Sequence, residues 1–202
     1  MLIPTIFQDY PECIPKKGIL HIGAHTCEEA PLYHSIGIND NQILWIEGNA
    51  DIIPTNQTNI INAVISNVDN QYVDFIITNN MQSSSILELG THLTEHPHVI
   101  EVARRKVQTV TLNSLYQNYN IPLDTFDFIN LDIQGAELKA LQGATHILPY
   151  IKAIYSEVNV KELYEGCAFM NQLDDFLIKY NFHRIATCMT KHGWGDALYI
   201  KS

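Results

Sequence analysis

Four positions along the chain place a turn residue or an acid at the end of an apolar run. Gly23 follows the run Gly18–Ile22, and acids stand at or near the ends of three later runs, at Glu47, Asp132 and Glu157. Each run has the length of a buried strand. A single acid at a strand end is as readily a helix cap or turn former. Ligands in parallel α/β sheets bind beyond the carboxyl ends of the strands, so we expect these four positions to line one pocket.

The spacing around the first turn favours a nucleoside over a dinucleotide. Glu47 follows Gly23 by 24 positions, and an acid about 20 residues after such a turn holds ribose hydroxyls. The turn lacks the G-x-G-x-x-G pattern, and Cys27 stands where a pyrophosphate needs close backbone approach. Glu28 and Glu29 would repel phosphate; they suit a cationic ammonium or sulfonium, or they only favour the helix dipole.

The elements that must position these residues alternate between strand and helix patterns. Strands are expected at 18–22, 42–47, 59–65, 71–77, 107–112, 125–132 and 152–158, and helices at 28–35, 113–120, 137–148 and 171–180. Thr111 or Asn113 can cap the second helix. The runs 182–188 and 197–201 form an antiparallel pair, while 88–106 give no clear pattern. We predict an α/β fold with a mostly parallel sheet and helices on both faces.

Composition bounds the class of protein. The chain has 202 residues and a formal net charge of -10, which argues against partners such as nucleic acid or an anionic membrane. No apolar run approaches the ~20 residues of a membrane helix. The start shows no basic signal region, and the four cysteines form no C-x-x-C pair, so we expect free thiols and a cytoplasmic location. Three prolines mark residues 1–17 as an irregular lead-in to a single domain over 18–202.

Five short blocks carry a resemblance to a known family. Residues 22–25, 45–49, 62–66, 83–87 and above all Asn130–Leu138 resemble the FkbM family of methyltransferases, and the similarity spans about residues 18–200. The resemblance implies a Rossmann-like class I methyltransferase sheet with a reversed last strand. It also implies S-adenosylmethionine as cofactor and methyl transfer to oxygen on a sugar, glycan or small molecule.

The resemblance also assigns residues to the cofactor. Gly23, Ala24 and His25 would line the methionine part, Glu47 would hold the ribose, and Ala63–Ser66 would flank the adenine. Asp132 and Gln134 would lie near the reacting methyl group. The full set is His21, Gly23, Ala24, His25, Glu47, Gly48, Asn49, Ala63, Val64, Ser66, Asp132 and Gln134. Two residues depart from the family pattern. His21 stands where many members have Asp, and Cys27 stands where many members have Gly. The Cys27 side chain would narrow the loop.

Methyl transfer to a hydroxyl also needs a base and an acceptor site. We favour Asp132 as the catalytic base, then Glu157, and regard His25 as a packing or hydrogen-bonding residue. Ser83, Ser84 and Ser85 suit acceptor hydroxyls, although a serine-rich loop is also ordinary turn chemistry. The sequence shows no metal cage, although Asp132 and Glu157 would suit a divalent ion if they converge.

Three other functions compete with methyl transfer. His92–His96 fits the H-x-x-E-H pattern of zinc peptidases, but Pro97 follows at once and breaks the helix that such a site needs. A nicotinamide-dependent oxidoreductase would use the same kind of sheet, but this sequence lacks the glycine pattern of such enzymes. A non-catalytic binder of the same fold is the third alternative.

Overall fold

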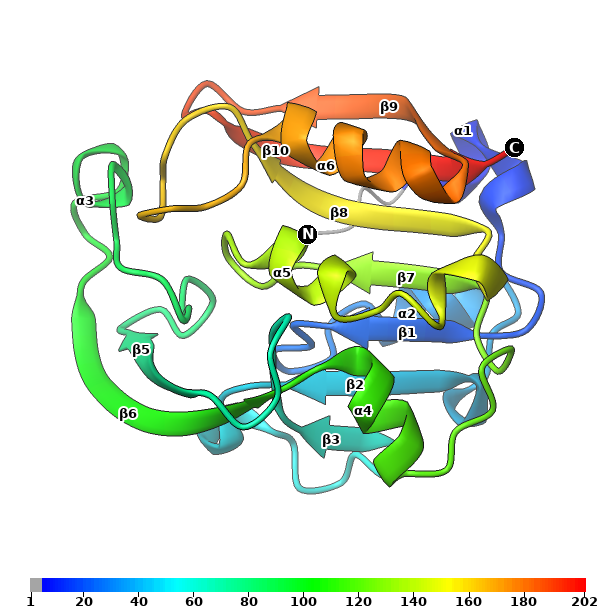
Figure 1. Cartoon of the computed structure of the whole chain (residues 1–202), viewed down its shortest axis with the longest axis horizontal. Helices are drawn as coiled ribbons and strands as arrows, with labels where there is room; N and C mark the ends of the chain where they lie inside the picture. The colour runs from blue at the N-terminus through cyan, green and yellow to red at the C-terminus, as the bar shows by residue number, and fades with distance from the viewer. Residues whose placement is uncertain (1–4) are drawn as a thin grey trace.

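The computed structural model describes residues 5–202 and contains a main sheet of seven strands (Figure 1). Their order across the sheet is β3-β2-β1-β7-β8-β10-β9, and β10 is antiparallel to both of its neighbours, while β3, β2, β1, β7 and β8 pair in parallel. The bounds are β1 Ile19–Ile22, β2 Ile43–Glu47, β3 Ile60–Asn62, β7 Phe128–Leu131, β8 Ala153–Asn159, β9 Phe182–Met189 and β10 Trp194–Lys201. This confirms the predicted α/β fold and its reversed last strand.

Helices cover both faces of the main sheet, as predicted. One face carries α4 (Leu112–Asn118), α5 (Glu137–Gln142) and α6 (Met170–Leu177), which lie in front of the strands in Figure 1. The other face carries α1 (Ile6–Asp9) and α2 (Ala30–Ser35). Because successive strand side chains point to opposite faces, Leu20 and Ile22 join the first core cluster while Ile19 joins the second.

Helix ends follow local capping chemistry. Thr111 Oγ1 accepts from the Ser114 N–H at 3.1 Å, which makes Thr111 the cap of α4. α2 begins at Ala30, two residues later than predicted, because the preceding residues form turns. Shorter 3₁₀ turns lie at Pro11–Cys13, Asp40–Gln42, Ala50–Ile52, Leu148–Tyr150 and Ile178–Tyr180.

The lead-in contains two short helical turns. α1 and the turn Pro11–Cys13 bury Ile6, Phe7 and Cys13 against the main sheet. Residues 1–4 of the predicted lead-in lie outside the described residues. The division into a lead-in and one domain stays a prediction.

A second, three-stranded sheet corrects two predictions. The predicted strand 59–65 divides at Ala63 into β3 and β4 (Val64–Ile65), and β4 pairs with β6 instead of β2. β6 runs over Glu101–Val110, six residues earlier than predicted, and pairs antiparallel with β5 (Tyr72–Thr78). Most of β6 is exposed and four of its ten residues are charged, so it lacks the apolar pattern by which buried strands are predicted.

The second sheet lies beyond the carboxyl ends of the parallel strands. In Figure 1, β5, β6 and α3 (His92–Glu95) stand on the side to which β1, β2 and β7 point. These elements stand beside the strand ends, on a side that the main sheet alone leaves open. Among the helices formed by residues 5–202, none is long and apolar enough to span a bilayer.

Candidate active site

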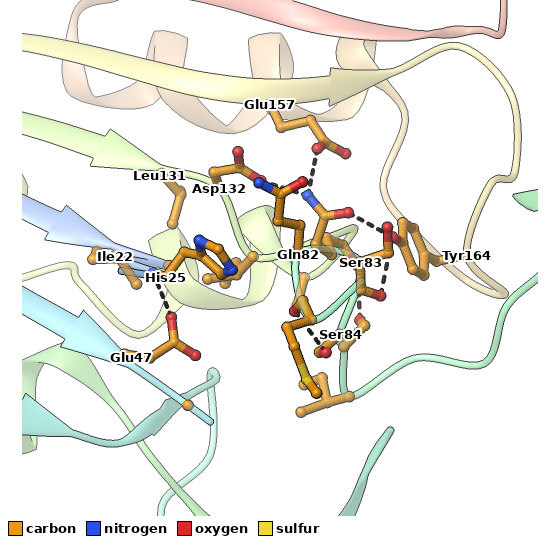
Figure 2. A pocket seen from close by; sticks show the side chains of 18 of the residues that line it. Ile22, His25, Glu47, Gln82, Ser83, Ser84, Leu131, Asp132, Glu157 and Tyr164 are labelled. Atoms are coloured by element: carbon orange, nitrogen blue, oxygen red, sulfur yellow. Dashed lines mark hydrogen bonds between the residues drawn. The ribbon is translucent and has the colours of Figure 1, made fainter. Parts of the chain in front are cut away.

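One cavity of about 610 Å³ opens at the carboxyl ends of the parallel strands, within the roughly 300–1,000 Å³ range of ligand pockets. Gly23 after β1, Glu47 at the end of β2, Asp132 after β7 and Glu157 in β8 all line it. Figure 2 shows Glu47 at one end of this cavity and Glu157 at the other. The predicted convergence of these four positions is confirmed.

The first turn is shaped by a glycine that no other residue can replace without strain. Gly23 has a φ of +89°, and a Cβ there would collide with the backbone carbonyl oxygen of Asp132. The N–H groups of Gly23 and Ala24 both donate to the Ile46 carbonyl, at 2.9 and 3.0 Å. The turn therefore presses close against the end of β7 and leaves its outer side to the cavity.

The Cys27 side chain does not line the cavity. It is buried in the core cluster on the α2 face. Its φ is +63°, a left-handed conformation that glycine adopts without cost. The expected narrowing of the loop by Cys27 stays a prediction.

Glu47 is a buried carboxylate held by two backbone donors. Oε2 accepts from the His25 N–H at 2.8 Å and Oε1 accepts from the Asn49 N–H at 2.7 Å. Burial raises the pKa of Glu47, and the two N–H donors oppose this shift. A carboxylate offers about four acceptor positions, so each oxygen keeps one for a ligand hydroxyl.

At the other end, the Gln134 side chain joins two acids. Its Nε2 donates to Asp132 Oδ1 at 2.6 Å and to Glu157 Oε2 at 2.8 Å. Its Oε1 accepts from the Tyr164 hydroxyl at 2.5 Å, and Figure 2 shows Tyr164 beside this network. The amide NH₂ thus faces the two acids, and the amide oxygen faces the Tyr164 hydroxyl, which donates to it.

The two acids differ in their surroundings. Burial raises the pKa of Glu157 well above its ordinary value, and the nearby Asp132 and Glu137 raise it further. Glu157 therefore favours its neutral form. A neutral carboxyl next to a second acid is a recurrent arrangement for proton transfer.

His21 faces the α2 side of β1 and also reaches the cavity wall. Its Nδ1 accepts from the Tyr33 hydroxyl at 2.9 Å, and that hydroxyl accepts from Asn130 Nδ2 at 2.8 Å. Burial lowers the pKa of His21 to about 4, so the ring is neutral. Its remaining nitrogen, Nε2, then carries the proton.

The structure brings most of the predicted site residues together. The ones that line the cavity are His21, Gly23, His25, Glu47, Gly48, Ala63, Val64, Ser83, Ser84, Ser85, Asp132, Gln134 and Glu157. Three do not line it: Ala24 is fully buried, Asn49 donates its backbone N–H to Glu47, and Ser66 donates to Asn67. The roles of all these residues stay predictions.

Sequence reasoning missed a further set of lining residues. It includes Phe75, Met81, His92, His96, His98, Tyr155, Tyr164, Trp194 and Asp196. α3 stops at Glu95, so His92 and His96 do not share the stable helix of a zinc peptidase. Within residues 5–202, no group of three or more His, Cys, Asp or Glu side chains could hold a metal ion.

Comparison with known proteins identifies the family of this arrangement. The profile described as "Methyltransferase FkbM domain" matches residues 21–184. A 2-O-methyltransferase, NoeI, of Sinorhizobium fredii (strain NBRC 101917 / NGR234) is 32% identical over 95 residues. That match covers 47% of this chain, and the chain spans only 38% of the length of that relative.

Two solved structures match this chain at low sequence identity. Both are magnesium protoporphyrin IX methyltransferase from Synechocystis PCC 6803, one with bound SAM and one with bound SAH. The TM-scores are 0.48 and 0.49, at 9% and 8% identity. The matches cover 97% of this chain and 75% and 78% of those chains.

Proposed function

The chain belongs to the FkbM methyltransferase family, and from that premise we propose that it transfers the methyl group of S-adenosylmethionine to a hydroxyl oxygen of a sugar, a glycan or another small hydroxylated molecule. S-adenosylmethionine is the methyl donor of this family. The observation that carries the proposal is the single cavity that joins the Gly23 turn and Glu47 to the acids around Gln134. The relative named as a 2-O-methyltransferase supports oxygen as the acceptor atom.

The residues at the Gly23 end fit the cofactor. Glu47 keeps free acceptor positions for the two ribose hydroxyls, and the turn at Gly23, which presses against the Asp132 carbonyl, lines the same cavity. Ala63, Val64 and Phe75 give an apolar wall suited to adenine. When bound, S-adenosylmethionine supplies an electrophilic methyl group on a sulfonium that leaves as a neutral thioether.

At the other end of the cavity, one of the two acids accepts the proton of the acceptor hydroxyl. Asp132 accepts the proton as the acceptor oxygen forms its bond to the methyl carbon and the carbon–sulfur bond breaks. Gln134 holds the Asp132 carboxylate in place, and Tyr164 fixes the orientation of Gln134. Glu157, in its neutral form, lies next to this proton transfer and does not accept the proton. Alignment of the two substrates supplies much of the rate enhancement.

Two measurements test this proposal. Calorimetry with S-adenosylmethionine, S-adenosylhomocysteine and NAD should show binding of both adenosyl ligands and not of NAD. A transfer screen with labelled cofactor should then mark at least one hydroxylated acceptor, and Asp132→Asn should lower kcat by ~100-fold or more. Binding of NAD alone would favour an oxidoreductase, and binding of S-adenosylhomocysteine without any transfer would favour a non-catalytic binder.

A further inference from the structure

One part of the cavity wall includes two residues, His92 and Trp194, that have no role in the mechanism above. It combines His92 of α3, Tyr164 of the loop after β8, and Trp194 at the start of β10. The His92 N–H donates to the Leu163 carbonyl at 3.1 Å, which ties α3 to the loop after β8. Glu95 of α3 completes the link, because its carboxylate meets Lys161 Nζ at 3.0 Å and His192 Nδ1 at 2.8 Å. Three segments distant in sequence are therefore fixed around this part of the cavity.

His92 carries the observation that points to a ligand. The residue is 4% exposed and lines the cavity, yet its Nδ1 has no hydrogen-bond partner in the described part of the chain. Its ring lies 5.3 Å from the ring of Tyr164. A buried polar atom without a partner is costly and rare in folded proteins. Because Nδ1 itself is enclosed, a ligand in the cavity reaches it only after the His92 ring turns, and the hydrogen bond formed then removes this cost.

The chemistry of His92 suits a hydroxyl group. Burial lowers its pKa to about 4, and the neighbouring His96 and His98 lower it further. A neutral imidazole has one donor and one acceptor nitrogen, which matches a hydroxyl that both donates and accepts. Ser83, Ser84 and Ser85 line the same cavity. Ser84 and Ser85 donate their hydroxyls to the Met81 and Gln134 carbonyls, whereas the Ser83 hydroxyl accepts from Asn80 Nδ2 and keeps its own donor.

The charge of the cavity excludes one class of acceptor. Besides the neutral Glu157, its acidic lining residues are Glu28, Glu29, Glu47, Asp132 and Asp196, and its described lining contains no Lys or Arg. A phosphate or carboxylate on the acceptor would find no cationic side chain to pair with and would lie near the Asp132 carboxyl group, which disfavours its binding. Trp194 offers instead a large apolar surface for the C–H face of a sugar ring.

We propose that His92, Trp194 and the Ser83–Ser85 loop form the acceptor subsite, and that this subsite takes an uncharged polyhydroxylated ring and rejects phosphorylated or carboxylated acceptors. The inference rests on the proposed methyl transfer to a hydroxyl. His92 is a binding residue, because it touches the acceptor and leaves the proton transfer to Asp132.

A binding experiment tests the subsite without turnover. Protein labelled with ¹³C-histidine and saturated with S-adenosylhomocysteine is titrated with methyl glycosides of neutral hexoses, deoxyhexoses and pentoses, then with hexose 6-phosphates and uronates. The His92 resonance, assigned by its absence in His92→Phe, should shift with at least one neutral glycoside and with none of the charged probes. Equal shifts from charged probes, or no shift from any neutral glycoside, would overturn the proposal.

A kinetic experiment separates this inference from the proposed function. His92→Phe keeps the ring against Tyr164 but removes the polar atoms, whereas His92→Asn restores an amide near the Nδ1 position. We expect the acceptor KM to rise ~10-fold or more in His92→Phe and to recover in part in His92→Asn, with the cofactor KM unchanged. The matched control is His183→Gln on the exposed part of β9, which should equal the wild type.

The outcomes of the two experiments are distinguishable. Methyl transfer with an unchanged acceptor KM in His92→Phe overturns the subsite and leaves the proposed function standing. Glycosides that shift His92 without any transfer support the subsite and refute the catalytic proposal. The thermal midpoint of His92→Phe should equal or exceed that of the wild type, because the substitution removes an unsatisfied buried nitrogen.

Discussion

Replacing Glu47 with glutamine is expected to weaken cofactor binding by about 10- to 150-fold. The carboxylate accepts backbone N–H groups from His25 and Asn49 and keeps further acceptor positions for the ribose. An amide has only one acceptor oxygen, so Glu47→Gln leaves one N–H facing an NH₂ group and removes the charge. A charged hydrogen bond contributes about 1.5–3 kcal/mol, and about 1.4 kcal/mol corresponds to a tenfold change in affinity.

Calorimetric titration with S-adenosylhomocysteine measures this effect, with the exposed Glu12→Gln as the matched control. The 2′-deoxyribose analogue of the ligand separates a direct contact from damage to the loop. In the wild type, loss of the 2′-hydroxyl should lower affinity, and in Glu47→Gln the same loss should have little further effect. An affinity within twofold of the wild type in Glu47→Gln would remove Glu47 from the ribose site.

The same site predicts a pH dependence. Burial raises the pKa of Glu47 above the ordinary value of 4.5, and the ribose contact needs the charged form. Affinity for S-adenosylhomocysteine should therefore fall as the pH is lowered through this raised pKa. Glu47→Gln should lack this component, and an identical pH profile in both proteins would contradict the assignment.

Three further predictions concern the residues around this site. Gly23→Ala and Gly37→Ala both place a Cβ at a positive φ (+89° and +87°), but nothing lies within 4 Å of the added atom at Gly37. We expect about 1–2 kcal/mol of lost stability in Gly37→Ala and a larger loss in Gly23→Ala. Equal thermal midpoints would refute the close approach at Gly23. Burial, aided by a neighbouring acid, raises the pKa of Glu137 to about 7, so the folded state binds more protons than the unfolded chain between pH 4.5 and 7. Stability should fall as the pH rises through that window. Thermal unfolding at pH 5 and pH 7.5 measures this fall, which should be smaller in Glu137→Gln than in the wild type. An equal fall in both proteins would show that another group is responsible. Tyr164→Phe removes the donor that orients Gln134 and should lower kcat about 3- to 10-fold without changing the affinity for S-adenosylhomocysteine, whereas an unchanged kcat would assign Tyr164 to packing alone.

The strand ends of the site were predictable because burial leaves a simple pattern. β1, β2, β7 and β8 are apolar runs that end near Gly23, Glu47, Asp132 and Glu157. Parallel strands bring their carboxyl ends to one edge, so the convergence of these residues follows from the order of elements alone.

The second sheet was not predictable in the same way. β6 has charged side chains at Glu101, Arg104, Arg105 and Lys106, and most of the strand is exposed. It is held in place by pairing with β5, while exposed cross-strand ion pairs such as Lys106 with Asp74, at 3.3 Å, add little. Pairing of this kind leaves no period in the sequence of β6.

Two residues of the cavity lining, Tyr164 and His92, escaped sequence reasoning for a related reason. Tyr164 lies 30 positions after Gln134, and His92 is further still from both in the chain. Their contacts depend on how three loops fold over the sheet edge. The only local signal was the H-x-x-E-H pattern around His92, which indicated a different chemistry.

Transfer of an isotopically labelled methyl group tests the central claim most directly. The protein is incubated with S-adenosylmethionine that carries a deuterated methyl group and with a panel of neutral glycosides and hydroxylated metabolites, and the products are examined by mass spectrometry. We predict a deuterated methoxy group on an acceptor oxygen, one S-adenosylhomocysteine formed per label, and loss of both in Asp132→Asn, which still binds S-adenosylhomocysteine. Label on nitrogen or carbon, or no label on any acceptor while S-adenosylhomocysteine binds, would contradict the account.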